Sequence, residues 1–306
     1  MIHLPFRFLS AQSSQSESVS SETPFSTNKK TSRVNWILGL LCAGWAGTLI
    51  SCSTSDTVST LGDWTVKSEL EGVARFGAAS FVSGNIAYMG TGADASNNRL
   101  KDFWAYDPSR NAWTQKADFG GTARQGAIAF AIGTKGYVGT GFDGNYLKDI
   151  WSYDPTANAW TKVASYGGSK RIGAVAFVIN NKAYVGTGNN NAIVQKDWYE
   201  YDPAQDLWTQ KADFITDQST IARSYAVGFS INGLGYIATG DGTTKDIWEY
   251  NPSTDTWATR GVFEGASRQY GVGFAIGNKG YVTTGRNGTS PLDDLWDFDP
   301  TVAQVQ

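Results

Sequence analysis

The stretch Asp149-Ile150-Trp151-Ser152-Tyr153-Asp154-Pro155 decides the fold, because it recurs along the chain at a nearly constant spacing. Each copy has an Asp, an apolar residue and an aromatic residue, followed two positions later by Tyr-Asp or a close substitute. The five copies begin at Asp102, Asp149, Asp197, Asp246 and Asp294, about 48 residues apart. Such a period predicts an array of similar structural units, and the repeats occupy almost all of the chain after residue 62.

One repeat contains four short segments that are typical of β-strands. In the second copy, the small and apolar run 126–132 is bounded by glycines and lacks helical spacing, so it predicts a buried strand. A turn separates this run from a second strand at 136–139, and a loop rich in Gly, Asp and Asn leads to a third at 150–153. Pro155 ends the third strand because proline cannot donate to a sheet, and 160–162 forms the fourth. Four antiparallel strands in about 48 residues predict one blade of a β-propeller.

The repeat resembles the Kelch repeat in having an aromatic residue on the second strand, Tyr-Asp-Pro after the third and Trp on the fourth. The fourth-strand tryptophans are Trp113, Trp160, Trp208 and Trp257. The chain departs from the Kelch pattern after the second strand, where Gly139-Thr140-Gly141 stands in place of a double glycine. The resemblance therefore implies an all-β, Kelch-type propeller but not a particular ligand. We assign the repeat tryptophans and aspartates a structural role.

The number of blades follows from the period. The fifth copy ends after its third strand, whereas Asp63-Trp64-Thr65-Val66-Lys67 matches the fourth-strand pattern, and Trp64 precedes Trp113 by about one repeat. The 243 residues from Trp64 to the C-terminus allow about 49 residues for each of five blades, and six blades would leave too few. We therefore expect a five-bladed propeller over residues 63–306, with its ring closed by the N-terminal outer strand.

The first 52 residues have the features of an export signal. Lys29, Lys30 and Arg33 precede an apolar run of about 17 residues that ends in Leu49-Ile50-Ser51-Cys52. This ending resembles the bacterial lipoprotein box, which implies acylation of Cys52; an uncleaved membrane anchor is the alternative. The segment 1–52 also includes a Ser-rich start that can reflect a start site assigned too far upstream. Residues 53–62 are small and polar, as expected for a flexible tether.

Composition excludes several kinds of chemistry from the repeats. Both cysteines, Cys42 and Cys52, and the single histidine, His3, lie before the first repeat. Disulfides, Cys/His metal sites, and Ser-His or Cys-His nucleophile pairs are therefore excluded from the propeller. The same absence excludes the copper chemistry of galactose oxidase, whose architecture the repeats resemble. We expect no metal and no cofactor. With a net charge of -3 and no basic stripe, the chain shows no sign of binding nucleic acid.

Five arginines recur just before the first strand of each repeat and are the candidate ligand-binding residues: Arg75, Arg124, Arg171, Arg223 and Arg268. First strands line the centre of a propeller, so these arginines should ring the mouth of its channel. The repeat aspartates start the third strands on the same face, which suggests one Arg–Asp pair per blade. The alternative is that some arginines stay free to hold a carboxylate.

The combined features predict a lipid-anchored protein of the bacterial cell envelope, at the outer membrane or cell surface. We expect a non-catalytic binding or scaffold module for a protein or glycan, attached to the membrane through its lipid alone. The alternative is an enzyme resembling the Kelch-type sialic acid mutarotases and epimerases, which would use Arg and carboxylate groups at the channel mouth. Of the glutamates that follow the leader, none stands out as a candidate base, and Glu200 and Glu249 lie inside repeat motifs. The loop 213–222 is longer than its counterparts, so we expect it to be the elaboration specific to a site.

Overall fold

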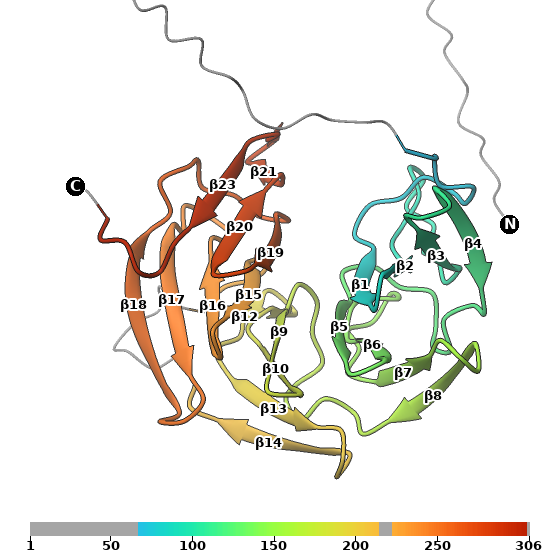
Figure 1. The fold of residues 1–306 in the computed structure, drawn as a ribbon, viewed down its shortest axis with the longest axis horizontal. Helices are drawn as coiled ribbons and strands as arrows, with labels where there is room; N and C mark the ends of the chain where they lie inside the picture. The colour runs from blue at the N-terminus through green and yellow to red at the C-terminus, as the bar shows by residue number, and fades with distance from the viewer. Residues whose placement is uncertain (1–66, 214–221, 305–306) are drawn as a thin grey trace, which may run out of the picture. The chain divides into compact units, whose positions relative to one another are not determined.

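A computed structural model describes residues 67–213 and 222–304, and every regular element in these residues is a β-strand. The described residues belong to one compact unit that spans 63–306. Apart from two short two-stranded ribbons, their strands form five antiparallel sheets arranged around a common centre, as Figure 1 shows, and each of these five sheets is one blade. The prediction of an all-β, five-bladed propeller is therefore confirmed.

The blades follow one another in chain order. The first contains β1 (Ala79–Ser83), β2 (Ile86–Gly90), β3 (Phe103–Asp107) and β4 (Ala112–Lys116). The second contains β5 (Ile128–Ile132), β6 (Lys135–Gly139), β7 (Ile150–Asp154) and β8 (Ala159–Val163). The third contains β9 (Val175–Ile179), β10 (Lys182–Gly186), β13 (Trp198–Asp202) and β14 (Leu207–Lys211). The fourth contains β15 (Val227–Ile231), β16 (Leu234–Ala238), β17 (Asp246–Asn251) and β18 (Thr256–Val262). The fifth contains β19 (Val272–Ile276), β20 (Lys279–Thr283) and β23 (Leu295–Phe298).

Two loops carry small ribbons of their own. The ribbon β11 (Asn189–Asn190) and β12 (Ile193–Val194) lies between the second and third strands of the third blade. The ribbon β21 (Arg286–Asn287) and β22 (Ser290–Pro291) lies at the same place in the fifth blade. In the first ribbon, Asn189 pairs with Val194 and Asn190 with Ile193.

The first strands lie innermost and hold the blades side by side. Contacts run from β1 to β5, from β5 to β9, from β9 to β15 and from β15 to β19. Small residues on one blade receive aromatic rings from the preceding blade: a Cβ on Gly136 would overlap the Phe81 ring, and one on Gly235 would overlap Phe177. The interior is thus built from interlocking blades, so that each blade depends on its neighbours for burial.

The outer tryptophans repeat one contact from blade to blade. Trp160 makes a tilted contact with Tyr153 of its own blade and an edge-to-face contact with Phe103 of the preceding blade, with ring centroids 4.9 Å apart in both cases. Its indole Nε1–H donates to the carbonyl of Ala117 at 3.1 Å. Ala117 is the first residue after the outer strand of the preceding blade. The structural role assigned to these tryptophans is therefore a contact between blades.

The fifth blade differs in having three strands among the described residues. Its outermost strand is β23, and the described parts of β19 and β1 make no contact with each other. The predicted closing strand begins at Asp63, and residues 63–66 lie outside the described residues, as does the leader with Cys52 and most of the loop 213–222. Closure by the N-terminal strand therefore stays a prediction.

Candidate functional site

Each blade carries one buried Arg–Asp pair on the face where the second and third strands are joined. The closest nitrogen–oxygen distances lie between 2.5 and 2.8 Å, and no arginine side chain is more than 2% exposed. The pairs are Arg75–Asp102, Arg124–Asp149, Arg171–Asp197, Arg223–Asp246 and Arg268–Asp294. The pairing suggested by the matching register of the two motifs is present in every blade.

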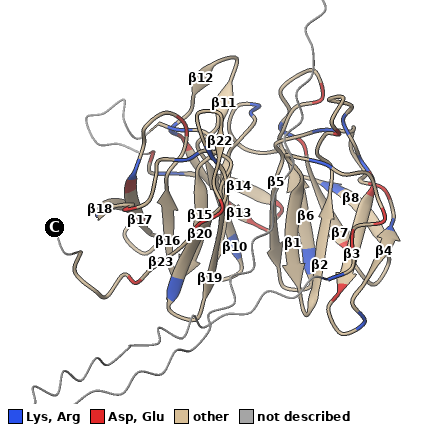
Figure 2. Ribbon diagram, turned by 90° about the horizontal axis from the view of Figure 1, so that it is seen from above, with Lys and Arg blue, Asp and Glu red and all other residues tan. Residues whose placement is uncertain are grey.

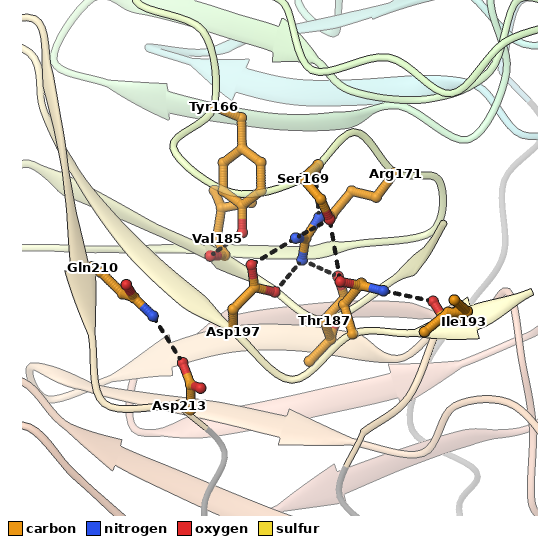
Figure 3. Close-up of polar contacts among 10 residues, drawn as sticks. Tyr166, Ser169, Arg171, Val185, Thr187, Ile193, Asp197, Gln210 and Asp213 are labelled. Atoms are coloured by element: carbon orange, nitrogen blue, oxygen red, sulfur yellow. Dashed lines mark hydrogen bonds and ion pairs between the residues drawn. The ribbon is translucent and has the colours of Figure 1, made fainter. Parts of the chain in front are cut away.

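The third blade shows how the guanidinium is held (Figure 3). Arg171 directs its two terminal nitrogens at the two carboxylate oxygens of Asp197, each at 2.7 Å. One of these nitrogens also donates to the Thr187 carbonyl at 2.7 Å, and Nε donates to the Ser169 carbonyl at 2.9 Å. The Ser169 hydroxyl accepts a further bond at 3.0 Å. All five donors of the guanidinium thus face oxygen atoms of the protein.

Aromatic side chains cover the pairs. The Tyr166 ring lies 4.7 Å from the Arg171 guanidinium carbon, and Phe119 and Phe263 occupy the same place at 4.8 Å in the second and fifth blades. These three connecting-loop aromatics are at most 5% exposed, so they seal the spaces between blades. In the second blade the Trp151 indole also donates to Asp149 at 2.8 Å. The sequence assigned the motif tryptophan to packing and did not identify this hydrogen bond.

The pairs determine the charge of the carboxylates. Burial alone would raise the pKa of Asp149, but hydrogen bonds from Arg124 and Trp151 outweigh it and lower the pKa. For Asp294 the hydrogen bond from Arg268 is the largest influence, and the pKa falls to about 2. Both carboxylates are therefore ionised near neutral pH. The five arginines act as structural cations in this arrangement, and a role for them in ligand binding stays a prediction.

The described lining of the central channel offers few groups that could react or bind a charged ligand. A cavity of about 440 Å³ runs between the first strands of all five blades. It is lined by small and apolar residues, such as Ala129, Ala131, Ala176 and Ser230, and no titratable side chain is among its lining residues. Figure 2 agrees with this, because Lys, Arg, Asp and Glu gather near strand ends and in loops. The channel thus offers no described acid or base for proton transfer.

The rim of the channel on the Arg–Asp face is a chain of backbone hydrogen bonds. Its members are the residues two positions after each repeat arginine: Gly77, Gly126, Gly173, Tyr225 and Tyr270. From Gly126 onwards, the N–H of each member donates to the carbonyl of the preceding member, at 2.8 to 3.2 Å. All five have left-handed backbones, with φ between 57° and 64°. We call these five residues the channel mouth.

Two members of the channel mouth break the repeat. Glycine adopts a left-handed backbone without strain, but a bulky aromatic residue rarely does, so Tyr225 and Tyr270 are held there at a cost in free energy. Their ring centroids are 4.2 Å apart. Arg286 lies over Tyr270 with its guanidinium carbon 4.7 Å from the ring centre, and Tyr270 remains 46% exposed. Strained backbones of this kind are concentrated at functional sites in proteins.

Groups from other blades converge on the same tyrosines. Burial raises the pKa of Tyr225, and Tyr270, Tyr146 and Asp241 raise it further, so the hydroxyl stays protonated at neutral pH. Asp241 is held by the backbone N–H and hydroxyl of Ser224, at 2.8 and 3.0 Å. Blades two, four and five thus contribute polar groups around one point on the rim.

A second arginine outside the repeat pairs lies in the loops of this face. The Arg99 guanidinium carbon is 4.9 Å from the centre of the Phe142 ring, and Phe142 occupies the repeat position that Arg286 occupies in the fifth blade. The Nε of Arg99 is buried with no hydrogen-bond partner in the described part of the chain. Sequence reasoning missed Arg99, Arg286 and both tyrosines. The signal was present, because Arg-x-Gly in the first three blades becomes Arg-x-Tyr in the last two.

The buried glutamates are also engaged. Glu200 accepts from Lys182 and Tyr184, at 2.7 and 2.8 Å, and Glu249 accepts from Arg260 and Tyr236. Burial tends to raise the pKa of Glu249, yet the bonds from Arg260 and Tyr236 lower it overall. Neither side chain lines the channel. Both glutamates therefore serve as ion-pair partners within their own blades.

A family model described as the KLHDC2/KLHL20/DRC7 Kelch-repeats domain matches residues 60–240, more than half of the chain. The chain belongs to the Kelch-repeat family. In this Kelch protein a threonine follows the second strand of each blade, where the Kelch pattern has a glycine. This threonine has a left-handed backbone in all five blades, with φ between 55° and 61°. Such a propeller is suited to binding or to acting as a scaffold.

Solved structures support the same fold. One titled "Structure of YjhT" matches with a TM-score of 0.67 and 17% sequence identity, over 78% of this chain and 86% of that chain. At this identity the likeness shows the fold alone. Among curated protein sequences, none matches the chain significantly.

Within 67–213 and 222–304, no group of three or more His, Cys, Asp or Glu side chains is arranged to hold a metal ion. No helix of sufficient length and hydropathy to cross a membrane occurs in that part of the chain.

Proposed function

We propose that the protein is a lipid-anchored binding module of the bacterial cell envelope, which holds a protein or glycan at the channel mouth without catalysing a reaction. The observation that carries this proposal is the contrast between the repeat arginines and the residues that break the repeat. The repeat arginines are buried and paired, whereas Tyr225, Tyr270 and Arg286 depart from the repeat at one place on the rim.

The chemistry of the channel mouth suits recognition. Tyrosine provides a large, rigid contact surface with a polar end, and tyrosine and arginine are the residue types that most often dominate binding interfaces. Arg286 has no carboxylate partner among the described residues, so its donors can serve a ligand. The backbone strain at the two tyrosines lowers the stability of the fold, and glycine at these positions would restore it. A residue that lowers stability in this way is expected where it serves binding and not folding.

The alternative, a sugar-acid mutarotase or epimerase, would need free arginines close to a carboxylate that can exchange a proton. The arginines of the ring are paired in every blade, and the buried carboxylates near them have lowered pKa values or cationic partners. These observations favour the binding module over the enzyme.

A pair of glycine substitutions tests the binding proposal. Tyr225→Gly and Tyr270→Gly convert the rim to the residue found in the first three blades, so the fold should persist with equal or higher thermal stability. We would screen the protein by thermal shift against sialic acids, uronic acids and neutral oligosaccharides. The proposal expects a stabilising ligand to lose its effect in Tyr270→Gly.

The matched control is Asn181→Gly, which makes a similar change at a left-handed residue in the turn between β9 and β10. This control should bind as the unchanged protein does. Equal binding by Tyr270→Gly would remove the channel mouth from the proposal. If no sugar stabilises the unchanged protein, a protein ligand becomes the expected partner.

Acylation is tested separately. Cys52→Ala should release the protein from the membrane fraction, because the proposed anchor is the lipid on that cysteine. Persistent association with membranes would contradict the assignment of the lipoprotein box.

A further inference from the structure

The two tyrosines of the channel mouth are the closest pair of tyrosines in the described part of the chain. The ring centroids of Tyr225 and Tyr270 are 4.2 Å apart and the ring planes differ by 34°. The other tyrosine pairs in contact there are separated by 5.3 to 5.6 Å. The backbones are also joined, because the Tyr270 N–H donates to the Tyr225 carbonyl at 3.1 Å. The two rings are therefore held together from both ends of the contact.

The hydroxyl ends of the two rings meet. Burial raises the pKa of Tyr225 most, and Tyr270 raises it further, in part through a hydrogen bond between the two side chains. The hydroxyl is the only polar group of a tyrosine side chain, so this bond brings the two hydroxyls together. Each hydroxyl-bearing carbon is flanked by the Cε carbons of its ring, which places the Cε carbons of one ring next to those of the other. These are the carbons at which tyrosyl radicals couple.

An oxidant in solution has access to this pair and not to the others. Tyr270 is 46% exposed, more than any other tyrosine of the described residues. The pairs Tyr88–Tyr153 and Tyr184–Tyr250 are at most 6% exposed. The propeller repeats also contain no cysteine, whose thiolate would compete for the oxidant. Proximity, orientation and access thus coincide at one tyrosine pair.

We propose that Tyr225 and Tyr270 are a site of oxidative cross-linking, at which a one-electron oxidant that uses hydrogen peroxide joins the two rings through a Cε–Cε bond. Each phenol loses one electron and one proton, and the two phenoxyl radicals couple. The hydrogen on each bonded carbon then moves to the phenolic oxygen, which restores both aromatic rings. One hydrogen peroxide takes up the two electrons and two protons and is reduced to two molecules of water. The protein loses two hydrogen atoms.

The cross-link ties the fifth blade to the fourth. The first strands of these blades, β15 and β19, lie in contact. Val272 on β19 is 52% exposed, whereas the equivalent Val227 on β15 is 2% exposed, so the fifth blade is the less well covered. A bond between the tyrosines encloses the fourth blade in a covalent loop, which restricts the unfolded chain and stabilises the fold. No ligand takes part, so this inference does not rest on the binding proposal.

Peroxidase treatment of the full-length chain tests the site. With a haem peroxidase and hydrogen peroxide, we expect mass spectrometry of the digested protein to show the Tyr225 and Tyr270 peptides joined within one chain, with the loss of two hydrogen atoms. Tyr225→Phe keeps the ring but removes the phenol, so the yield of this cross-link should fall roughly tenfold or more. The matched control is Tyr146→Phe, which changes a tyrosine close enough to affect the pKa of Tyr225. It should cross-link as the unchanged protein does.

A second measurement follows stability. Oxidation should raise the urea midpoint of the unchanged protein, followed by circular dichroism, and should not raise that of Tyr225→Phe. Coupling mainly between separate chains would overturn the proposal, as would equal coupling at the buried pair Tyr88–Tyr153. It would also be overturned if Tyr270 were oxidised, or left unmodified, without a bond to Tyr225. None of these readouts involves a ligand, so such a result would leave the binding proposal standing.

Discussion

Removing the carboxylate of Asp197 should destabilise the propeller strongly, because it leaves the Arg171 charge buried without a counter-charge. The Arg171 side chain is fully buried and Asp197 is 21% exposed. That carboxylate accepts two of the hydrogen bonds that Arg171 donates, and the other acceptors are backbone carbonyls and the Ser169 hydroxyl. Breaking one side of a buried pair costs about 3–5 kcal/mol. We expect a loss in this range for Asp197→Ala.

A double variant separates two quantities: the destabilisation caused by leaving the Arg171 charge unpaired, and the stabilisation that the ion pair provides. Replacing both partners, Arg171→Met with Asp197→Ala, removes the charge as well as the bonds. Its loss should therefore be smaller than that of Asp197→Ala alone. Equilibrium urea denaturation of the full-length chain, followed by tryptophan fluorescence, measures each value from the midpoint at constant slope.

The exposed pair Lys101–Asp118 is the control, since its side chains are 54% and 47% exposed. Asp118→Ala should cost less than about 1 kcal/mol. If Asp197→Ala costs no more than this control, the arginine ring does not stabilise the blades, and the argument for a structural ring is refuted.

Three further predictions concern the packing and the charge. Gly136→Ala should lower the free energy of unfolding by about 1–3 kcal/mol, because its Cβ would overlap the Phe81 ring. The control, Gly133→Asn in the open turn beside it, should change this free energy by less than about 0.5 kcal/mol. Similar urea midpoints for the two variants would contradict the packing argument. Trp160→Phe keeps most of the ring but loses the bond to Ala117, so a loss of about 1 kcal/mol is expected in the same assay, and none would show that the bond is dispensable. Because Arg268 holds the pKa of Asp294 at about 2, below its ordinary 3.8, the stabilisation by this carboxylate is present above about pH 4 and is lost as the pH falls towards 2. Asp294→Asn should therefore lower the urea midpoint at pH 6 more than at pH 2.5, and an equal decrease at both would disagree with this assignment.

The sequence predicted the fold because the period and the strand pattern agreed. Four strands per repeat and the stop at Pro155 follow from local chemistry, and the Arg–Asp pairs follow from two motifs in matching register. The bond from Trp151 to Asp149 was missed, because a tryptophan in an apolar motif is indistinguishable from a packing residue until the carboxylate is placed.

The channel mouth could be predicted only in part. Arg-x-Gly becoming Arg-x-Tyr is visible in the sequence, but its importance depends on the left-handed backbone at that position, which only the structure shows. The partners of Tyr270 are also non-local, since Arg286 comes from a different loop and Tyr225 from the preceding blade. Local patterns do not specify which loops meet over a rim.

The two tyrosines of the channel mouth give a nearly five-fold structure a direction. Five identical rim positions would offer a ligand five equivalent orientations, and a bound partner would be distributed among them. Tyr225 and Tyr270 are neighbours in consecutive blades, so they distinguish one orientation from the other four. Selecting one of five orientations corresponds to a factor of five, or about 1 kcal/mol of discrimination. A repeat protein can thus present a single orientation to its partner through two substitutions on an otherwise regular ring.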